Sequence, residues 1–148
     1  VHEGGAKVTN DPADPGGLTK YGISKRANPD LDIANLTEAQ AGAIYRERYW
    51  TPCRCGEMPW PVALVVFDCA VNMGVGRAAR LLQMALRVPA DGAIGPKTLA
   101  ALASADALAV AREIQAQRIM AYVALPGWGR FGLGWTRRAM SVMADAAG

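Results

Sequence analysis

The residues of this chain that are best suited to chemistry lie near its start. Glu3 precedes a Gly-Gly pair, and a turn-rich segment carrying Asp11, Asp14 and Thr19 follows. A carboxyl group between a helix end and a folded-back loop is partly desolvated, which raises its pKa and allows it to act as a general acid near neutral pH. Glycoside hydrolysis needs such an acid and a second group that activates water, attacks, or stabilises charge. Asp14 or Asp11 can fill the second role, and Thr19 can position a water.

Other kinds of catalytic chemistry lack their motifs. The sequence has no GxSxG, no HExxH and no phosphate-binding Gly-rich loop, which excludes the serine hydrolase, zinc peptidase and nucleotide-binding classes. Its one histidine, His2, and its cysteines, Cys53, Cys55 and Cys69, do not have the spacing of a four-ligand zinc site, so no metal and no cofactor are predicted. Two states of the cysteines stay open: one disulfide from Cys69 to Cys53 or Cys55, or three buried thiols.

The composition is that of an ordinary globular protein. Of 148 residues, 51% are hydrophobic and 20% are charged, which excludes an intrinsically disordered chain. The net charge of +3 suits an anionic partner but lacks the Lys/Arg density of a nucleic-acid binder, so no nucleic acid is predicted. The longest apolar run, residues 61–67, is far shorter than the ~20 residues that span a bilayer.

The first half of the chain reads as turns followed by helices. Residues 6–20 are rich in Asn, Asp, Pro and Gly, which predicts successive turns or a short irregular hairpin. Ser24 is suited to cap a helix beginning near Lys25. Thr37 with Gln40 forms a capping-box pattern that predicts a helix reaching about Trp50.

The second half reads as a series of helices. Residues 62–72 predict a buried helix that ends at the glycines of 73–76, and residues 77–88 predict an amphipathic helix. Pro96 suits a first helical position, and residues 105–125 predict a long helix. Residues 128–135 are predicted as a Gly-aromatic loop and residues 136–146 as a last helix. The fold class is therefore mostly α with a short irregular β/turn segment near the start, in two lobes that meet near residues 74–77.

The first five residues have the pattern of a helix end. Gly is preferred just past a helix terminus, so residues 1–5 are predicted to close a helix whose body precedes Val1. We therefore expect an N-terminal truncation or processing event. An export or anchor segment would lie in that preceding stretch, and it is the only route by which membrane contact is expected.

Several stretches together carry a resemblance to a known family. The chain resembles glycoside hydrolase family 108, the bacterial and phage muramidases of the lysozyme-like superfamily, with their C-terminal peptidoglycan-binding region. The resemblance covers almost the whole chain in order, and it is carried by residues 3–5, 10–24, 49–50, 67–68, 70–74, 82–83, 91–96, 98–99 and 134–138.

The resemblance implies a lysozyme-like helical fold and roles for individual residues. It makes Glu3 the catalytic acid, with Asp14 and Thr19 where phage-type lysozymes place an acidic residue and a water-positioning Thr. The Asp-to-Thr spacing is similar but not identical, so Asp11 stays a candidate for the second role. Residues 1–76 would form the catalytic lobe and residues 77–148 a helical peptidoglycan-binding lobe.

Further residues are candidates for binding sugar. Sugar rings pack on aromatic side chains while a few polar groups fix their hydroxyls. Such a groove could be lined by Tyr21, Tyr45, Tyr49, Trp50 and Trp60, with Trp50 and Trp135 better explained as core.

Two polar residues join this set. Asp68 and Asn72 lie four apart on a predicted helix and so project from one side of it. If buried, they need partners. We interpret Asn72 as facing a pocket, where it would hydrogen-bond an N-acetyl group.

The function predicted from these observations is that of an N-acetylmuramidase, acting as a monomer on the bacterial wall, in the periplasm or after release. It would cleave the β-1,4 bond between N-acetylmuramic acid and N-acetylglucosamine without a cofactor. Two alternatives stay open. A lytic transglycosylase would use a single Glu and form a 1,6-anhydro product, and a non-catalytic wall-binding protein would result if Glu3 were disabled.

Overall fold

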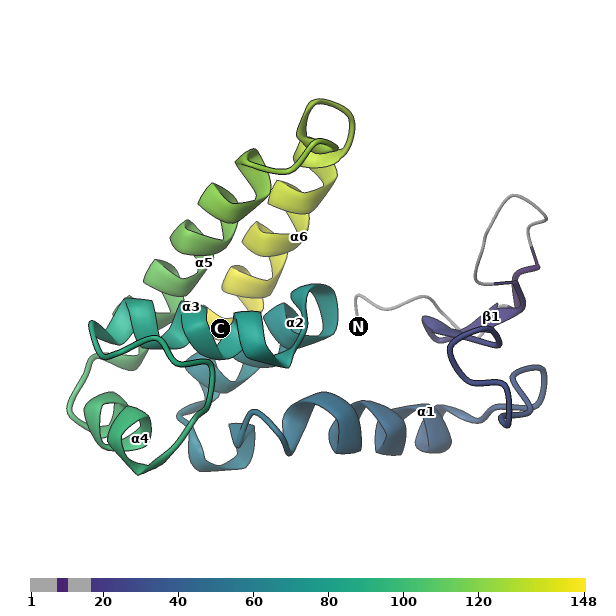
Figure 1. Cartoon of the computed structure of the whole chain (residues 1–148), viewed down its shortest axis with the longest axis horizontal. Coiled ribbons are helices and arrows are strands. Elements are labelled where there is room, and N and C mark those ends of the chain that lie inside the picture. The colour runs from purple at the N-terminus through teal and green to yellow at the C-terminus, as the bar shows by residue number, and fades with distance from the viewer. Residues whose placement is uncertain (1–7, 11–16) are drawn as a thin grey trace. The chain divides into compact units, whose positions relative to one another are not determined.

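The computed structural model describes residues 8–10 and 17–148 (Figure 1). The chain divides into two compact units, an N-terminal unit (residues 1–46) and a C-terminal unit (residues 47–148). The predicted helix end at residues 1–5 lies outside the described residues. The fold is mostly α with one small sheet, as the sequence predicts.

The described residues of the N-terminal unit form a short hairpin and one helix. Strands β1 (Thr19–Lys20) and β2 (Ile23–Ser24) pair antiparallel, and Thr9 adds an isolated bridge to Thr19. Helix α1 (Glu38–Tyr45) begins with the predicted capping box. The Thr37 Oγ1 accepts from the Gln40 N–H at 3.2 Å, and the Gln40 Oε1 accepts from the Thr37 N–H at 2.9 Å. The buried core of this unit consists of Ile23, Ile33, Leu36 and Ala41.

The helix predicted near Lys25 is wrong, because residues 25–37 form turns. Ser24 does accept a hydrogen bond from the Ala27 N–H at 3.4 Å, so a single capped turn forms. Pro29 then prevents its continuation, since proline lacks an N–H and disfavours helical backbone at the residue before it. Asn28 instead turns back and donates its side-chain N–H to the Ser24 carbonyl at 2.9 Å.

The C-terminal unit is all helical. After the π-helical turn η1 (Arg46–Trp50) and the 3-10 turn η2 (Cys55–Glu57) come five α-helices. These are α2 (Trp60–Met73), α3 (Val75–Leu86), α4 (Pro96–Ala103), α5 (Ala107–Val123) and α6 (Trp128–Ala147). The predicted buried helix, the helix start at Pro96 and the long helix ending near residue 125 are confirmed. The helical stretch predicted to reach about Trp50 does so, although its last five residues, Arg46–Trp50, are π-helical instead of α-helical.

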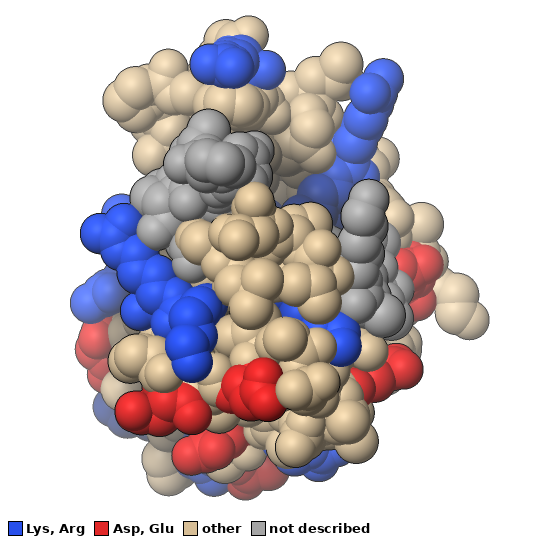
Figure 2. Space-filling model, turned by 90° about the vertical axis from the view of Figure 1, so that its right-hand side faces the viewer, with Lys and Arg blue, Asp and Glu red and all other residues tan. Residues whose placement is uncertain are grey.

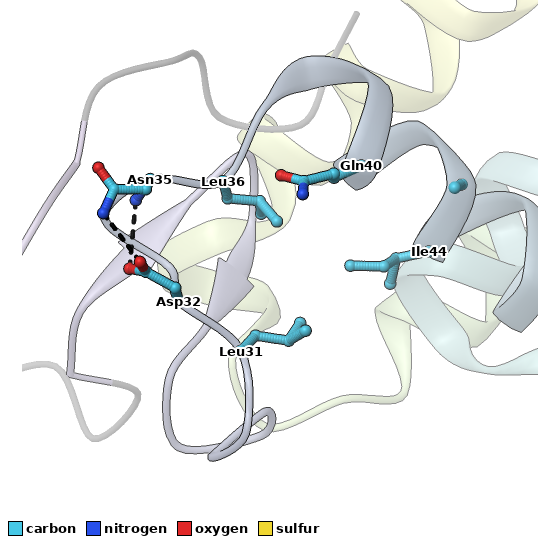
Figure 3. Close-up of a pocket in the computed structure, with 7 residues that line it drawn as sticks. Leu31, Asp32, Asn35, Leu36, Gln40 and Ile44 are labelled. Carbon is cyan, nitrogen blue, oxygen red and sulfur yellow. Dashed lines mark hydrogen bonds between the residues drawn. The ribbon is translucent and has the colours of Figure 1, made fainter.

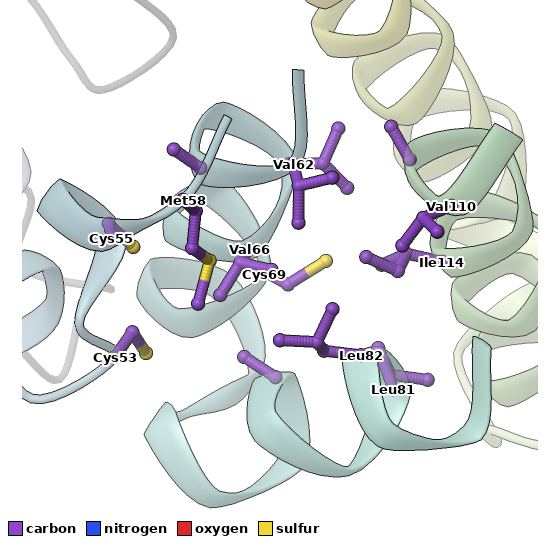
Figure 4. Packing of buried hydrophobic residues seen from close by; sticks show 14 of the residues in the cluster. Cys53, Cys55, Met58, Val62, Val66, Cys69, Leu81, Leu82, Val110 and Ile114 are labelled. Carbon is purple, nitrogen blue, oxygen red and sulfur yellow. The ribbon is translucent and has the colours of Figure 1, made fainter. Parts of the chain in front are cut away.

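Helix α2 is the centre of this unit. It packs against α3, α5 and α6, while α5 and α6 run side by side as a helical hairpin (Figure 1). The Cys69 side chain on α2 points toward Ile114 of α5, and Leu82 of α3 belongs to the same buried cluster (Figure 4). Gly74, with φ of 95°, separates α2 from α3 in a backbone conformation that L side chains rarely adopt.

The loop predicted at residues 128–135 is wrong, because these residues form the first two turns of α6. Glycine opposes helix formation, but here tertiary contacts prevail. The Trp135 ring packs against the Tyr122 ring at 5.2 Å and against the Phe131 ring, one turn before it, at 6.0 Å. Gly132 leaves the space that the Trp128 ring occupies, since a Cβ there would lie 2.6 Å from it.

The cysteines are three buried thiols, so of the two open interpretations the structure has the one without a disulfide. Burial raises the pKa of Cys69 to about 12, which keeps its thiol protonated and unreactive. No group of three or more metal-binding side chains occurs within residues 8–10 and 17–148. Among the helices described, none is long and apolar enough to cross a membrane.

Two alanine substitutions in α6 test its first turns. Gly132→Ala should lower the free energy of unfolding by about 1–3 kcal/mol, because the new methyl group must displace the Trp128 ring. Gly134→Ala, whose Cβ meets nothing within 4 Å, should raise it by about 0.5–1 kcal/mol, because alanine favours a helix. Urea denaturation followed by circular dichroism measures both values. Equal effects of the two variants would contradict the helical assignment.

The state of the thiols is also measurable. A thiol-specific chromogenic reagent should label almost none of the three cysteines in the native protein at pH 8, since all three are buried. In guanidinium chloride without reductant it should label all three. Recovery of a single thiol in the denatured protein would show a disulfide and refute the assignment.

Candidate functional site

The acidic candidates of the predicted catalytic set are not among the residues that the structure describes. Glu3, Asp11 and Asp14 all lie outside the described residues. Thr19 is described, and it is the first residue of β1. The only structural information on the catalytic set therefore concerns Thr19 and the hairpin that carries it.

Thr19 is half-buried and held at both its backbone and its side chain. Its N–H and carbonyl exchange hydrogen bonds with Thr9 at 2.8 and 2.9 Å. Its hydroxyl donates to the Gly17 carbonyl at 3.2 Å. A hydroxyl that donates in this way keeps its oxygen lone pairs for accepting a hydrogen bond from a water.

Two of the predicted sugar-binding tyrosines lie together in the N-terminal unit. The hairpin turn consists of Tyr21 and Gly22, both with positive φ, as a two-residue type I′ turn requires. The Tyr45 hydroxyl, at the end of α1, donates to the Tyr21 carbonyl at 2.8 Å and so ties the turn to the helix. The Lys20 ammonium lies 5.6 Å from the centre of the Tyr21 ring. Tyr49 lies in the C-terminal unit, where it packs against the hydrophobic core.

A pocket of about 390 Å³ lies between the turns and α1 (Figure 3). Leu31, Leu36 and Ile44 supply apolar walls, and Asp32, Asn35 and Gln40 supply polar groups. These polar groups already have partners, because Asn35 donates to Asp32 at 2.8 Å and Gln40 belongs to the capping box. The hydrogen bonds from Asn35 lower the pKa of Asp32. This pocket was not predicted from the sequence, because no motif marks it.

Asp68 and Asn72 project from one side of α2, as their spacing predicts, and both have partners. Asp68 is buried and accepts from the Arg118 Nη1 at 2.7 Å and from the Arg138 Nη2 at 2.8 Å. Asn72 accepts from the Tyr122 hydroxyl. Burial raises the pKa of Tyr122.

The buried Arg118 connects these two groups. Its Nε donates to the Tyr122 hydroxyl at 2.7 Å while its Nη1 binds Asp68, so one guanidinium orients both partners. The Arg138 side chain reaches the same carboxylate from α6. The Nη2 atom of Arg118 has no hydrogen-bond partner in the described part of the chain.

The roles of Arg118, Tyr122 and Arg138 were not predicted from the sequence. A signal was present, because Arg118 and Tyr122 continue the four-residue spacing of the buried Val110 and Ile114 along α5. An arginine at such a core-facing position requires a buried acidic partner, and Asp68 is the one buried acidic residue in the described part of the chain.

The surface of the molecule carries charges of both signs. Figure 2 shows Lys and Arg as well as Asp and Glu side chains on the face in view. Neither sign alone covers that face.

The family assignment comes from comparison with known proteins. The model of the family described as Glycosyl hydrolase 108 matches residues 1–74, half of the chain. This chain belongs to glycosyl hydrolase family 108. A second family model, described as Predicted Peptidoglycan domain, matches residues 77–140. The two matches confirm the resemblance found in the sequence.

A solved structure agrees with this family 108 assignment. The chain is similar to the SagA protein of Brucella abortus, with 33% sequence identity and a TM-score of 0.84. The likeness covers 98% of this chain and 87% of that one. No match to the chain was found among curated proteins. The family assignment establishes a lysozyme-like, mostly α protein that acts on peptidoglycan.

Removing the buried carboxylate should destabilise this family 108 chain strongly. Asp68→Asn leaves the Arg118 guanidinium buried without its counter-charge, at a cost of about 3–5 kcal/mol in the free energy of unfolding. Urea denaturation measures the loss. Glu57→Gln is the matched control, because it removes a carboxylate from a solvent-exposed pair with Arg54, and we expect a much smaller change. A loss under ~0.5 kcal/mol for Asp68→Asn would show that the cluster does not stabilise the fold.

Proposed function

We propose that this protein is an N-acetylmuramidase that hydrolyses the β-1,4 bond between N-acetylmuramic acid and N-acetylglucosamine in peptidoglycan. The observation that carries the proposal is the family 108 match over residues 1–74, because this range includes Glu3 and the hairpin with Thr19. The second match, over residues 77–140, supports peptidoglycan as the substrate.

In the proposed reaction Glu3 protonates the leaving glycosidic oxygen. Asp14 stabilises the developing positive charge on the sugar or organises the attacking water, with Asp11 as the other candidate for this role. Thr19 accepts a hydrogen bond from that water through the hydroxyl oxygen that its contact with Gly17 leaves available. Carboxyl groups and water suffice for this chemistry, so no cofactor is proposed.

We further propose that Tyr21 and Tyr45 contact the glycan. Their mutual hydrogen bond fixes the hairpin turn to α1, which would present a rigid surface to a sugar ring. Tyr49, Asp68 and Asn72 remain proposed binding residues. The last two are already held by Arg118, Arg138 and Tyr122, so they would contact substrate only through atoms that these partners leave open.

For the domain organisation we propose a catalytic lobe over residues 1–76 and a wall-binding lobe over residues 77–148. The family matches support this division, since they meet between residues 74 and 77. The compact units divide after Arg46 instead. Helix α2 thus belongs to the family 108 match by sequence, while it packs with the helices of the second match. We propose that the protein acts on the bacterial wall as a monomer, in the periplasm or after release.

The proposal is tested by digesting purified peptidoglycan and identifying the products by mass spectrometry. The unmodified chain should release fragments with reducing N-acetylmuramic acid ends. Glu3→Gln should lower the rate by roughly 10²–10⁴-fold, because it removes the general acid. Glu38→Gln, which makes the same change at an exposed residue of α1, should leave the rate unchanged.

Other products would contradict the proposal in distinct ways. Anhydro ends would identify a lytic transglycosylase. Wall binding without any released fragment would identify a non-catalytic binding protein. Comparison of Asp11→Asn with Asp14→Asn then assigns the second carboxylate, since the one that acts should show the larger rate loss.

A further inference from the structure

The outward face of α3 carries a row of basic side chains. Arg77, Arg80 and Met84 are exposed, and their spacing of three and four residues places them on one side of the helix. The exposed Arg87 follows directly after the helix as its C-cap residue. Residues 75–90 contain no Asp or Glu, so no acidic neighbour on the same helix balances these charges.

The stability of the helix does not account for this row. Arg77 lies in the first turn of α3, where the helix dipole disfavours a cation, and only Arg87 benefits from the dipole at the other end. Among the described residues, none of the ion pairs includes Arg77 or Arg87. The Asp91 carboxylate lies near Arg80, whose charge contributes to the lowered pKa of Asp91.

The turn beside this row is rigidly held. The buried side chain of Gln83 accepts from the Gly92 N–H at 2.9 Å and donates to Asp91 at 2.7 Å. The backbone N–H of Ala93 also donates to Asp91, at 2.9 Å, and this contact is the main reason that the pKa of Asp91 is lowered. The Asp91 carboxylate is thus hydrogen-bonded within its own turn.

Gly92 allows Arg80 to lie against this turn. Its φ is +81°, and a Cβ at this position would meet the Arg80 guanidinium at 3.0 Å. The side chain of Arg80 is therefore placed over a fixed turn, between Arg77 and Arg87 in the row. Arg80 is thus held against the turn, and the exposed Arg77 and Arg87 add two further positive charges near the exposed Met84.

We propose that Arg77, Arg80 and Arg87 bind the free carboxylates of the peptide stems of peptidoglycan. The inference rests on the proposed function, and it names which part of the wall this surface recognises. The guanidinium group matches a carboxylate through two parallel hydrogen bonds, and Met84 provides contact for the aliphatic parts of a peptide. We assign carboxylates as the ligand because their charge complements that of the arginines. We assign them to peptidoglycan because the peptidoglycan-domain match begins at Arg77 and includes the whole row.

The test measures sedimentation of the full chain with insoluble peptidoglycan, in a Glu3→Gln background that prevents digestion. The triple variant Arg77→Gln, Arg80→Gln, Arg87→Gln should bind roughly tenfold more weakly at low salt, because it loses its charge-assisted hydrogen bonds. The matched control replaces three exposed arginines of α5 and α6 by Gln and should change binding less than twofold; its residues are Arg112, Arg130 and Arg137. Circular dichroism checks that both variants fold. Wall binding by the single variant Arg77→Glu, a change at an exposed position, provides a second measurement.

The ligand is identified by changing the wall. Peptidoglycan with its carboxyls amidated should bind the parent chain as weakly as intact wall binds the triple variant. Equal binding of the parent to amidated and intact wall would overturn the inference, as would equal losses in the triple variant and its control. A triple variant that loses binding to duplex DNA but keeps wall binding would overturn it in favour of a nucleic acid.

Failure of this inference is distinguishable from failure of the proposed function. The chain with Glu3 intact is tested separately for release of reducing ends. Release of these ends by the triple variant, together with unchanged wall binding, would retain the muramidase proposal and refute the role of α3. Absence of wall binding by the parent chain would refute the role of α3 whatever the digestion shows.

Discussion

A single buried carboxylate fixes the arrangement of the C-terminal unit. Asp68 lies on α2 among otherwise apolar neighbours, and an unpaired charge in that position would cost several kcal/mol. Arg118 of α5 and Arg138 of α6 both reach it. Because hydrogen bonds to a carboxylate tolerate little displacement, the three helices can pack in few ways that satisfy all these groups. Apolar side chains, among them Val62, Val66 and Leu82, pack together in the core of this unit.

This constraint bears on how the two family regions work together. Helix α2 lies in the glycosyl hydrolase 108 match, while α5 and the greater parts of α3 and α6 lie in the peptidoglycan-domain match. Their shared core means that the second region is not an appendage on a flexible linker. A mutation that disturbs the core on either side should therefore affect both regions, and the proposed division of function near residue 76 is not a division of folding.

The sequence predicted those features that depend on local chemistry. Fold class, the capping box at Thr37 and the buried helix around Asp68 follow from side-chain spacing and from cap residues, which act within a few residues. The helix at residues 128–135 could not be predicted in this way, because its stability comes from ring contacts with Tyr122, a residue of another helix. The turns after Lys25 were missed for a local reason, since the effect of Pro29 outweighs the cap at Ser24.

For the candidate site, the sequence predicted which residues share a face but not which residues they contact. That Asp68 and Asn72 share one face of α2 follows from their spacing, whereas their partners come from segments about 50 and 70 residues away. The link between Tyr45 and the Tyr21 carbonyl likewise depends on how the hairpin packs, which no spacing within the sequence reveals. The roles of Glu3 and Asp14 come from the family resemblance and stay predictions.

The central structural claim is that α2, α5 and α6 fold as one cooperative unit around Asp68. Native-state hydrogen exchange of the full chain measures this directly, because it gives an opening free energy for each backbone amide. If the three helices form one unit, their slowest amides open with the same free energy, equal to that of global unfolding. Opening free energies of α2 amides well below those of α5 and α6 would show two separate folding units and contradict this claim.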